Sequence, residues 1–222
     1  MQKLEPWALA AVPCVLGIGL WFQGPWALLS LVVVVAALVL LLAGWETSTP
    51  ALRQILPAVS LAAIGAVGRI LFAAIPDVKP LSAIVILTGV SLGSRSGFLC
   101  GALAALVSNL FFGQGSWTPW QMYAWGLMGY IAGACAKRGW LATRSQAAVF
   151  GFVAAIGFGL LMDCYTLVGF VRPLSWGGVV ATFSASLVFD LVHGVATAAF
   201  LWLLWDSWRR ILARFKQRYD LL

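Results

Sequence analysis

The sequence predicts an all-α integral membrane protein, and three observations lead there: its composition, its apolar runs and the placement of its cations. The chain has 222 residues, of which 62% are hydrophobic and only 9% are charged. A soluble domain averages about 45–50% apolar and about 25% charged residues. A chain this apolar cannot cover a water-facing surface, which excludes a soluble enzyme, a disordered chain and a nucleic-acid-binding domain.

The first two apolar runs, over 7–22 and 26–44, predict an N-terminal transmembrane hairpin within residues 1–46. No small-residue cleavage site clearly follows the first run, so we interpret it as a retained span and not as a signal peptide. The polar stretch Glu46-Thr-Ser-Thr-Pro50 then marks the best boundary in the chain.

Six further apolar runs predict a helical core over residues 55–210: 55–75, 81–92, 97–112, 119–136, 146–170 and 178–205. The 81–92 run is short for a span, which predicts a helix that is tilted or partly sunk among its neighbours. Residues 211–222 are expected to form a basic cytoplasmic tail.

The cations predict the orientation of these spans. With both termini in the cytoplasm, 11 of the 14 Lys and Arg residues fall on inside segments, Lys79 and Arg172 fall on outside loops, and Arg69 falls within a span. Short loops with such an excess of cations on one side lie in the cytoplasm. We therefore expect a multi-pass protein of the plasma membrane with both termini cytoplasmic, and a basic tail that rests on the anionic leaflet.

Few residues suggest catalysis, a metal site or a cofactor. Single cysteines stand in apolar stretches at Cys14, Cys100, Cys135 and Cys164, without a C-x-x-C or a Cys/His cluster, which favours buried thiols over disulfides or metal ligands. The sequence has no H-E-x-x-H, no G-x-S-x-G and no P-loop. We assign no catalytic residue, metal or cofactor, and any active transport needs an ATPase on another subunit.

Ionisable side chains inside the predicted spans usually face a bundle interior or a cavity. Arg69 and Asp163 lie at similar predicted depths, so they either pair with each other or contact a ligand. Asp190 and His193 are three residues apart on one helix face, which favours an intrahelical hydrogen bond. We expect Arg69, Asp190 and His193 to be buried structural groups.

Small residues recur in the first core run at Ala58, Ala62 and Ala66, every fourth position. Such a stripe lets another helix approach closely. Taken alone, it fits internal packing at least as well as a partner interface.

The stretch 57–133 resembles the S components of energy-coupling factor (ECF) transporters, the cobalamin-specific group above all. The likeness is carried by the alanine stripe, by Pro76-Asp-Val-Lys-Pro80 and by Gly97-Phe-Leu-Cys-Gly-Ala-Leu-Ala-Ala-Leu-Val-Ser-Asn109. It continues in Phe111-Phe-Gly-Gln-Gly-Ser-Trp-Thr-Pro-Trp-Gln-Met122 and Ala124-Trp-Gly-Leu-Met-Gly129. The two N-terminal runs lie outside the six-helix core of that family.

The resemblance implies a six-helix subunit that binds a vitamin near the extracellular face, without enzymatic activity of its own. It implies docking of Ala58, Ala62 and Ala66 on a transmembrane coupling subunit of the EcfT type, with two cytoplasmic ATPase subunits supplying energy. The protein would topple in the bilayer to deliver its vitamin. The three outer loops and nearby polar residues would form the site: Asp77, Lys79, Asn109, Gln114, Trp117, Thr118, Trp120, Gln121, Asp163, Arg172 and Trp176.

Cobalamin suits these loops, because its amide side chains need polar partners and its corrin faces suit tryptophan. The tryptophans also fit an interfacial aromatic belt. Three alternatives stay open: an S component for another vitamin or a modified-base precursor, an intramembrane enzyme using Asp163, Asp190 and His193, and a stand-alone secondary transporter. The last would need coupling-ion sites and often inverted repeats, which we do not find.

Overall fold

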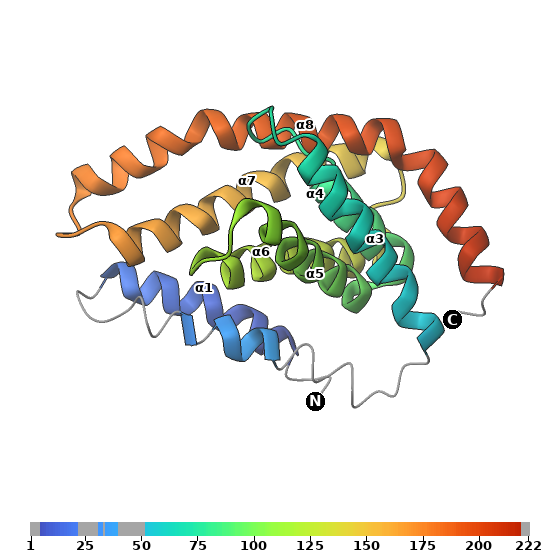
Figure 1. Cartoon of the computed structure of the whole chain (residues 1–222), viewed down its shortest axis with the longest axis horizontal. Coiled ribbons are helices and arrows are strands. Elements are labelled where there is room, and N and C mark those ends of the chain that lie inside the picture. The colour runs from blue at the N-terminus through green and yellow to red at the C-terminus, as the bar shows by residue number, and fades with distance from the viewer. Residues whose placement is uncertain (1–4, 22–30, 33, 40–51, 219–222) are drawn as a thin grey trace.

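The structure, a computed structural model, describes residues 5–21, 31–32, 34–39 and 52–218, and every regular element within them is a helix. The helices are α1 (Glu5–Trp21), α3 (Leu52–Leu71), α4 (Leu81–Leu92), α5 (Ser94–Phe112), α6 (Trp117–Lys137), α7 (Arg144–Phe170) and α8 (Trp176–Arg218) (Figure 1). The all-α prediction is confirmed. Most of the predicted second span, the boundary at 46–50 and the end of the tail lie outside the described residues.

Membrane character follows from the length and hydropathy of the helices. Within the described residues, three helical segments are long and apolar enough to cross a bilayer: Ser94–Phe112, Arg144–Phe170 and Trp176–Gln217. Two shorter apolar segments, Ile55–Leu71 and Leu81–Leu92, accompany them. The protein is therefore an all-α membrane protein.

The short helix α4 forms the centre of the bundle. All residues from Leu81 to Gly89 are buried, and the helix contacts α3, α5, α6, α7 and α8. Its 12 residues span about 18 Å at 1.5 Å per residue, too little to cross a bilayer unaided. The prediction of a helix sunk among its neighbours is confirmed, and its surroundings explain why it lacks a polar face.

Glycines let α4, α5 and α6 cross with their backbones in contact. A methyl group at Gly97 would lie 2.5 Å from the carbonyl oxygen of Gly129, and one at Gly101 would overlap the backbone of Trp125. A methyl group at Gly133 would lie 2.5 Å from the amide nitrogen of Ser94. No side chain fits at these positions, so the glycines determine how closely the three helices approach.

The N-terminal helix α1 packs on the bundle alongside α7. Its Leu9 carbonyl accepts a hydrogen bond from the Tyr123 hydroxyl of α6 at 2.5 Å. Leu9 and Val12 join a buried apolar cluster with Trp120 and Val168. The described part of the predicted hairpin is thus packed against the core.

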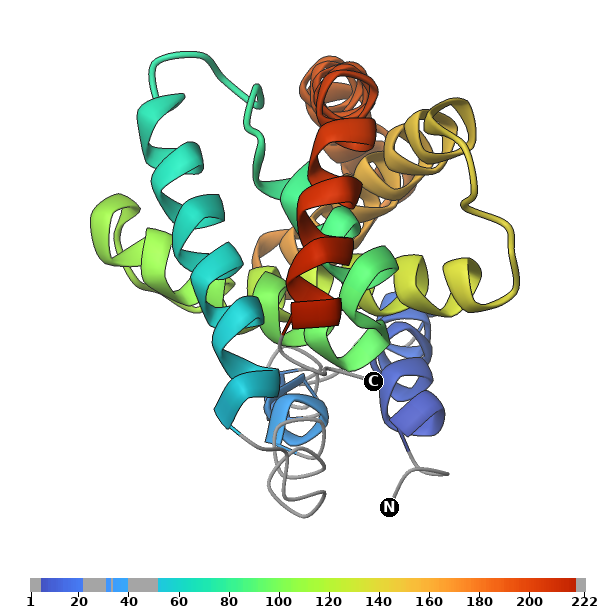
Figure 2. The ribbon, with the colours of Figure 1, turned by 90° about the vertical axis from the view of Figure 1, so that its right-hand side faces the viewer.

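Helix α8 continues well beyond the predicted end of its span at residue 205 and reaches Arg218. Figure 1 shows it running beside α7 and then turning, and in Figure 2 the turned part lies across the end of the bundle. Trp205 and Leu212 anchor this part, since both are buried in the main apolar cluster. The first part of the predicted basic tail, residues 211–218, is therefore helical.

The glycine contacts predict a stability difference between two Gly→Ala variants. Gly129→Ala should destabilise the protein by about 1–3 kcal/mol, because the added methyl overlaps the Gly97 backbone. Gly157→Ala in α7 is the matched control, since nothing lies within 4 Å of the place that its added methyl would take. Thermal unfolding in detergent measures both, and equal melting temperatures would contradict the proposed role of the glycines.

Candidate substrate site

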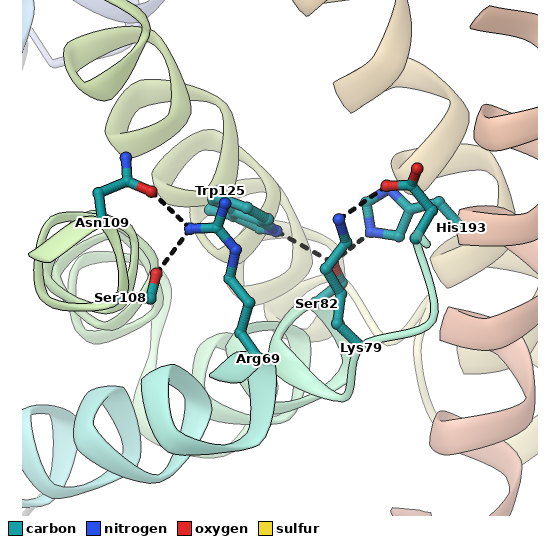
Figure 3. Close-up of polar contacts among 8 residues, drawn as sticks. Arg69, Lys79, Ser82, Ser108, Asn109, Trp125 and His193 are labelled. Atoms are coloured by element: carbon teal, nitrogen blue, oxygen red, sulfur yellow. Dashed lines mark hydrogen bonds and ion pairs between the residues drawn. The ribbon is translucent and has the colours of Figure 1, made fainter. Parts of the chain in front are cut away.

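Arg69, in the last turn of α3, joins that helix to the end of α5. Its Nη1 donates to Ser108 Oγ at 2.6 Å and to Asn109 Oδ1 at 2.8 Å (Figure 3). The guanidinium carbon also lies 4.6 Å from the centre of the Phe112 ring and 4.9 Å from that of Trp125. The cation is thus held by two hydrogen bonds and two aromatic faces.

Asn109 extends this network into the α5–α6 loop. It is fully buried, and its Nδ2 donates to Thr118 Oγ1 at 3.1 Å and to Gln121 Oε1 at 2.8 Å. Thr118 in turn donates to Gln114 Oε1 at 2.8 Å. We call Arg69, Ser108, Asn109, Thr118, Gln121 and Gln114 the Arg69 network. Most polar atoms of this network form hydrogen bonds that hold the α5–α6 loop against the ends of α5 and α6.

A second buried cluster, which we call the Ser82 triad, ties α4 to α6 and α8. Trp125 Nε1 donates to Ser82 Oγ at 3.0 Å, and Ser82 Oγ lies 2.7 Å from His193 Nε2 (Figure 3). All three side chains are at most 2% exposed. Because Trp125 also lies against Arg69, the triad and the Arg69 network form one continuous region.

The α3–α4 loop places an ion pair beside this region. Lys79 Nζ lies 2.7 Å from Asp77 Oδ1 and 6.0 Å from the centre of the Trp125 ring. Burial lowers the pKa of Lys79, and the Asp77 carboxylate opposes that shift. Asp77 adopts a positive φ of 56°, a conformation that aspartate tolerates better than most residues.

The intramembrane carboxylates lie elsewhere, between α7 and α8. Ser186 Oγ donates to Asp163 Oδ2 at 2.5 Å, and a side chain at Gly159 would overlap the Asp190 carboxylate. Asp163 does not pair with Arg69, and His193 bonds to Ser82 instead of Asp190. The predicted Asp190–His193 hydrogen bond is therefore wrong, and of the two alternatives for Arg69 and Asp163 the direct pair is not formed. Arg69 bonds to α5, Asp163 to α8 and His193 to α4.

The predicted loop residues do not all lie in one place. Asn109, Gln114, Thr118 and Gln121 come together in one network, whereas Arg172 and Trp176 show no contact with it among the described residues. Arg172 donates to the Val168 carbonyl at 2.9 Å, and Trp176 is 84% exposed. Figure 1 shows that the tip of the α7–α8 hairpin, which carries them, projects beyond the α3–α4 loop.

The two loop tryptophans also differ. Trp117 is 39% exposed and packs over Gly115, so its ring is accessible to a ligand. Trp120 is only 1% exposed, and its ring lies 5.4 Å from that of Tyr165 in an apolar cluster. The prediction that Trp120 lines the site does not fit this burial, because its face is already covered by the protein.

The alanine stripe faces the interior of the bundle. Ala58, Ala62 and Ala66 are 0%, 2% and 1% exposed, and Ala62 joins the main core with Ala104 and Ala105 of α5. The prediction that these three residues dock on a partner does not fit this arrangement, because α3 uses them to approach its own neighbours. The exposed face of α3 is instead formed by Leu56, Val59, Ser60, Ala63, Ile64, Val67 and Leu71.

Comparison with known families identifies the family to which this chain belongs. Residues 46–189 match the family model described as ECF-type riboflavin transporter, S component. The chain belongs to this family of S components. No curated protein and no solved structure matches it.

Membership confirms the predicted class. S components are membrane-embedded transporter subunits for small-molecule vitamins, not enzymes, and they work with a transmembrane coupling subunit and ATPase subunits. The matched residues include the Arg69 network, Asp77, Lys79, Ser82 and Trp125. The match begins at residue 46, so both apolar runs of the predicted N-terminal hairpin lie outside it. The family description names riboflavin and gives no support to cobalamin.

Sequence reasoning missed several residues that the structure places in or beside the site: Ser82, Ser108, Trp125, Tyr165 and Ser186. Serines are common in membrane helices and carry no periodic signal. Ser82 and His193 are separated by 111 residues, so only the fold shows that they meet. The one signal in the sequence was the position of Ser82, a polar residue near the start of a predominantly apolar run.

The Ser82 triad predicts that Ser82→Ala lowers stability. The substitution leaves the Trp125 indole N–H and one His193 nitrogen without a partner in a buried place, which costs about 1–3 kcal/mol. Ser184→Ala, an exposed serine of α8, is the matched control. Thermal unfolding in detergent gives the comparison. If Ser82→Ala melts with the control, the triad does not contribute to stability.

Proposed function

We propose that this S component binds riboflavin, or a closely related flat aromatic vitamin, between the α3–α4 loop and the Arg69 network. The observation that carries the proposal is the grouping of Lys79, Asp77 and Arg69 around Trp125. The Trp125 ring is itself fully buried, so it supports these polar groups and does not stack on the ligand. A flavin ring has broad apolar faces and an edge of carbonyl oxygens and one N–H. Aromatic walls with a few fixed donors and acceptors suit such a ligand.

The polar groups have matching chemistry. The Lys79 ammonium donates to carbonyl oxygens, and the Asp77 carboxylate accepts from a ring N–H. The hydrogen bonds of Arg69 to Ser108 and Asn109 both use Nη1. Its Nε and Nη2 take no part in these two bonds. The partly exposed Trp117 ring offers a stacking face at the mouth of the region.

Cobalamin is the second candidate, since the sequence of the α5–α6 loop favoured it. That argument relied on Gln114, Ser116, Thr118 and Gln121 to bind the corrin amides. In the structure Gln114, Thr118 and Gln121 bond within the Arg69 network, and Ser116 Oγ lies 2.6 Å from the Tyr165 hydroxyl. Fewer loop groups are left for amide recognition, which favours riboflavin.

The ligand is tested by titrating riboflavin into the detergent-purified protein and following quenching of flavin fluorescence. We expect saturable one-to-one binding in the nanomolar range, about −12 kcal/mol, without ATP or partner subunits. Cobalamin, titrated by calorimetry, should give no binding of comparable affinity. Tight cobalamin binding without riboflavin binding would overturn the choice of ligand, and failure of both would direct the search to other vitamins or modified-base precursors.

A matched pair of charge substitutions tests the position of the site. Lys79→Gln should weaken riboflavin binding about tenfold or more, because a hydrogen bond to a charged group is worth about 1.5–3 kcal/mol. Lys137→Gln, an exposed lysine at the other end of α6, should leave affinity unchanged. Equal affinities of the two variants would move the site away from the α3–α4 loop.

For orientation we propose that both termini and the α6–α7 loop face the cytoplasm. Lys137, Arg138 and Arg144 flank this loop, and Arg209 of α8 donates to the Ala142 carbonyl within it at 2.9 Å. These four cations thus lie together at one end of the bundle, which supports a cytoplasmic position for that end. The vitamin would then enter from the extracellular side and be delivered by reorientation of the subunit in the membrane.

We further propose that the coupling subunit, of the EcfT type with two ATPase subunits, docks on the exposed face of α3. Val59, Ser60, Ala63 and Val67 lie on that face, and small side chains among them allow close helix approach. This surface replaces the buried alanine stripe as the expected interface.

If the coupling subunit docks on this face of α3, a substitution there should separate coupling-subunit binding from riboflavin binding. Ala63→Trp should abolish co-purification with the co-expressed coupling subunit while riboflavin affinity is kept, because the bulky ring blocks helix contact. Val153→Trp, at an exposed position of α7, controls for a large ring on the lipid-facing surface. Retained co-purification of Ala63→Trp would rule out this face, and loss in both variants would show a non-specific effect.

A further inference from the structure

A basic cavity lies at the end of the bundle opposite the candidate substrate site. It has a volume of about 670 Å³ and lies between the end of α4, at Val90 and Ser91, and the C-terminal part of α8. The α8 residues that line it include Asp206, Arg209, Arg210 and Lys216. The turned part of α8 thus forms one wall of the cavity.

The charges of this cavity favour an anion. Three cations and one carboxylate line the cavity. The Asp206 carboxylate also forms an ion pair with Arg144, whose Nη1 lies 3.9 Å from Asp206 Oδ2. Arg209 is oriented by the Ala142 carbonyl and by the Trp205 ring, 5.0 Å from its guanidinium carbon. Arg210 is oriented through Nε, which donates to the Asp206 carbonyl at 3.1 Å. The backbone and an aromatic ring therefore orient the two guanidinium groups.

Ser91 gives a second, independent indication of a ligand. It lines the cavity, and its buried Oγ has no hydrogen-bond partner among the described residues. Buried polar groups without a partner are rare in native proteins, because each costs free energy. With its side chain turned toward the cavity, this hydroxyl would donate to a phosphate oxygen there, and the phosphate would neutralise the nearby cations.

The surroundings identify the source of the phosphate. Trp202, Leu203 and Ile211 are 48%, 72% and 52% exposed on the same part of α8. Exposed apolar residues next to basic ones are typical of a helix at the membrane interface. We propose that the basic cavity binds the phosphate of an anionic phospholipid of the cytoplasmic leaflet, whose acyl chains lie along these apolar side chains. Basic pockets at this depth suit lipid headgroups.

The test uses the full-length protein in detergent, with phosphatidylglycerol as the probe and native mass spectrometry as the readout. The double variant Arg210→Gln/Lys216→Gln should bind the lipid about tenfold or more weakly, because two cations near the phosphate are lost. The double variant Lys137→Gln/Arg138→Gln removes the same charge from the same end but outside the cavity, and should bind like the parent.

Ser91→Ala provides a variant without a change of charge. It should weaken phosphatidylglycerol binding several-fold while the melting temperature of the lipid-free protein stays equal or rises, since the unpartnered hydroxyl is removed. This variant keeps the test valid if the double variant fails to fold.

Four outcomes would overturn the proposal. Equal loss in the two double variants would show diffuse attraction to a basic surface, and unchanged binding by Ser91→Ala would remove the cavity as the site. Equal binding of phosphatidylcholine would exclude recognition of an anionic headgroup. Displacement of the lipid by glycerol phosphate at equal concentration would indicate a site for soluble phosphates.

Discussion

The backbone contact among α4, α5 and α6 is the constraint on which the rest of the structure depends. Gly89, Gly97 and Gly129 leave no room for a methyl group between these helices. Close approach replaces the hydrophobic driving force that is absent between helices in lipid, since packing and hydrogen bonds hold membrane helices together. It also places Trp125 of α6 next to Ser82 of α4, which allows the Ser82 triad to form.

The candidate site is built on this rigid centre, and its Arg69 network is already hydrogen-bonded without a ligand. Asn109 forms hydrogen bonds within the protein through both its carbonyl oxygen and its amide nitrogen. Its side chain therefore positions Arg69 and the α5–α6 loop and is not left to bind a ligand. In the proposed site, recognition would then fall to Lys79, Asp77 and the partly exposed face of Trp117. A binding subunit gains affinity from such order, because little conformational freedom is lost when the ligand arrives.

The sequence predicted the fold well and the contacts poorly, for identifiable reasons. Apolar runs predicted where the helices lie, most closely at 81–92, where shortness alone indicated burial, but they missed the continuation of α8 to Arg218. The alanine stripe at Ala58, Ala62 and Ala66 predicted a close helix contact, which the structure has, but the pattern does not say which helix is the neighbour. Of the two alternatives for Arg69 and Asp163, the direct pair is not formed, because depth along two helices says nothing about the side on which each residue faces.

The two ends of α4 connect the two proposed sites of this S component. Ser82 at one end bonds to the residues beside the candidate vitamin site, and Ser91 at the other lines the basic cavity. Helix α4 is buried from Leu81 to Gly89, and its backbone contacts α6 at Gly89. We therefore expect its two ends to move as one rigid body. If the subunit reorients in the membrane, its vitamin end and its lipid-facing end must move together. A phospholipid held at the basic cavity would therefore resist that rotation until its phosphate left the cavity or moved with it.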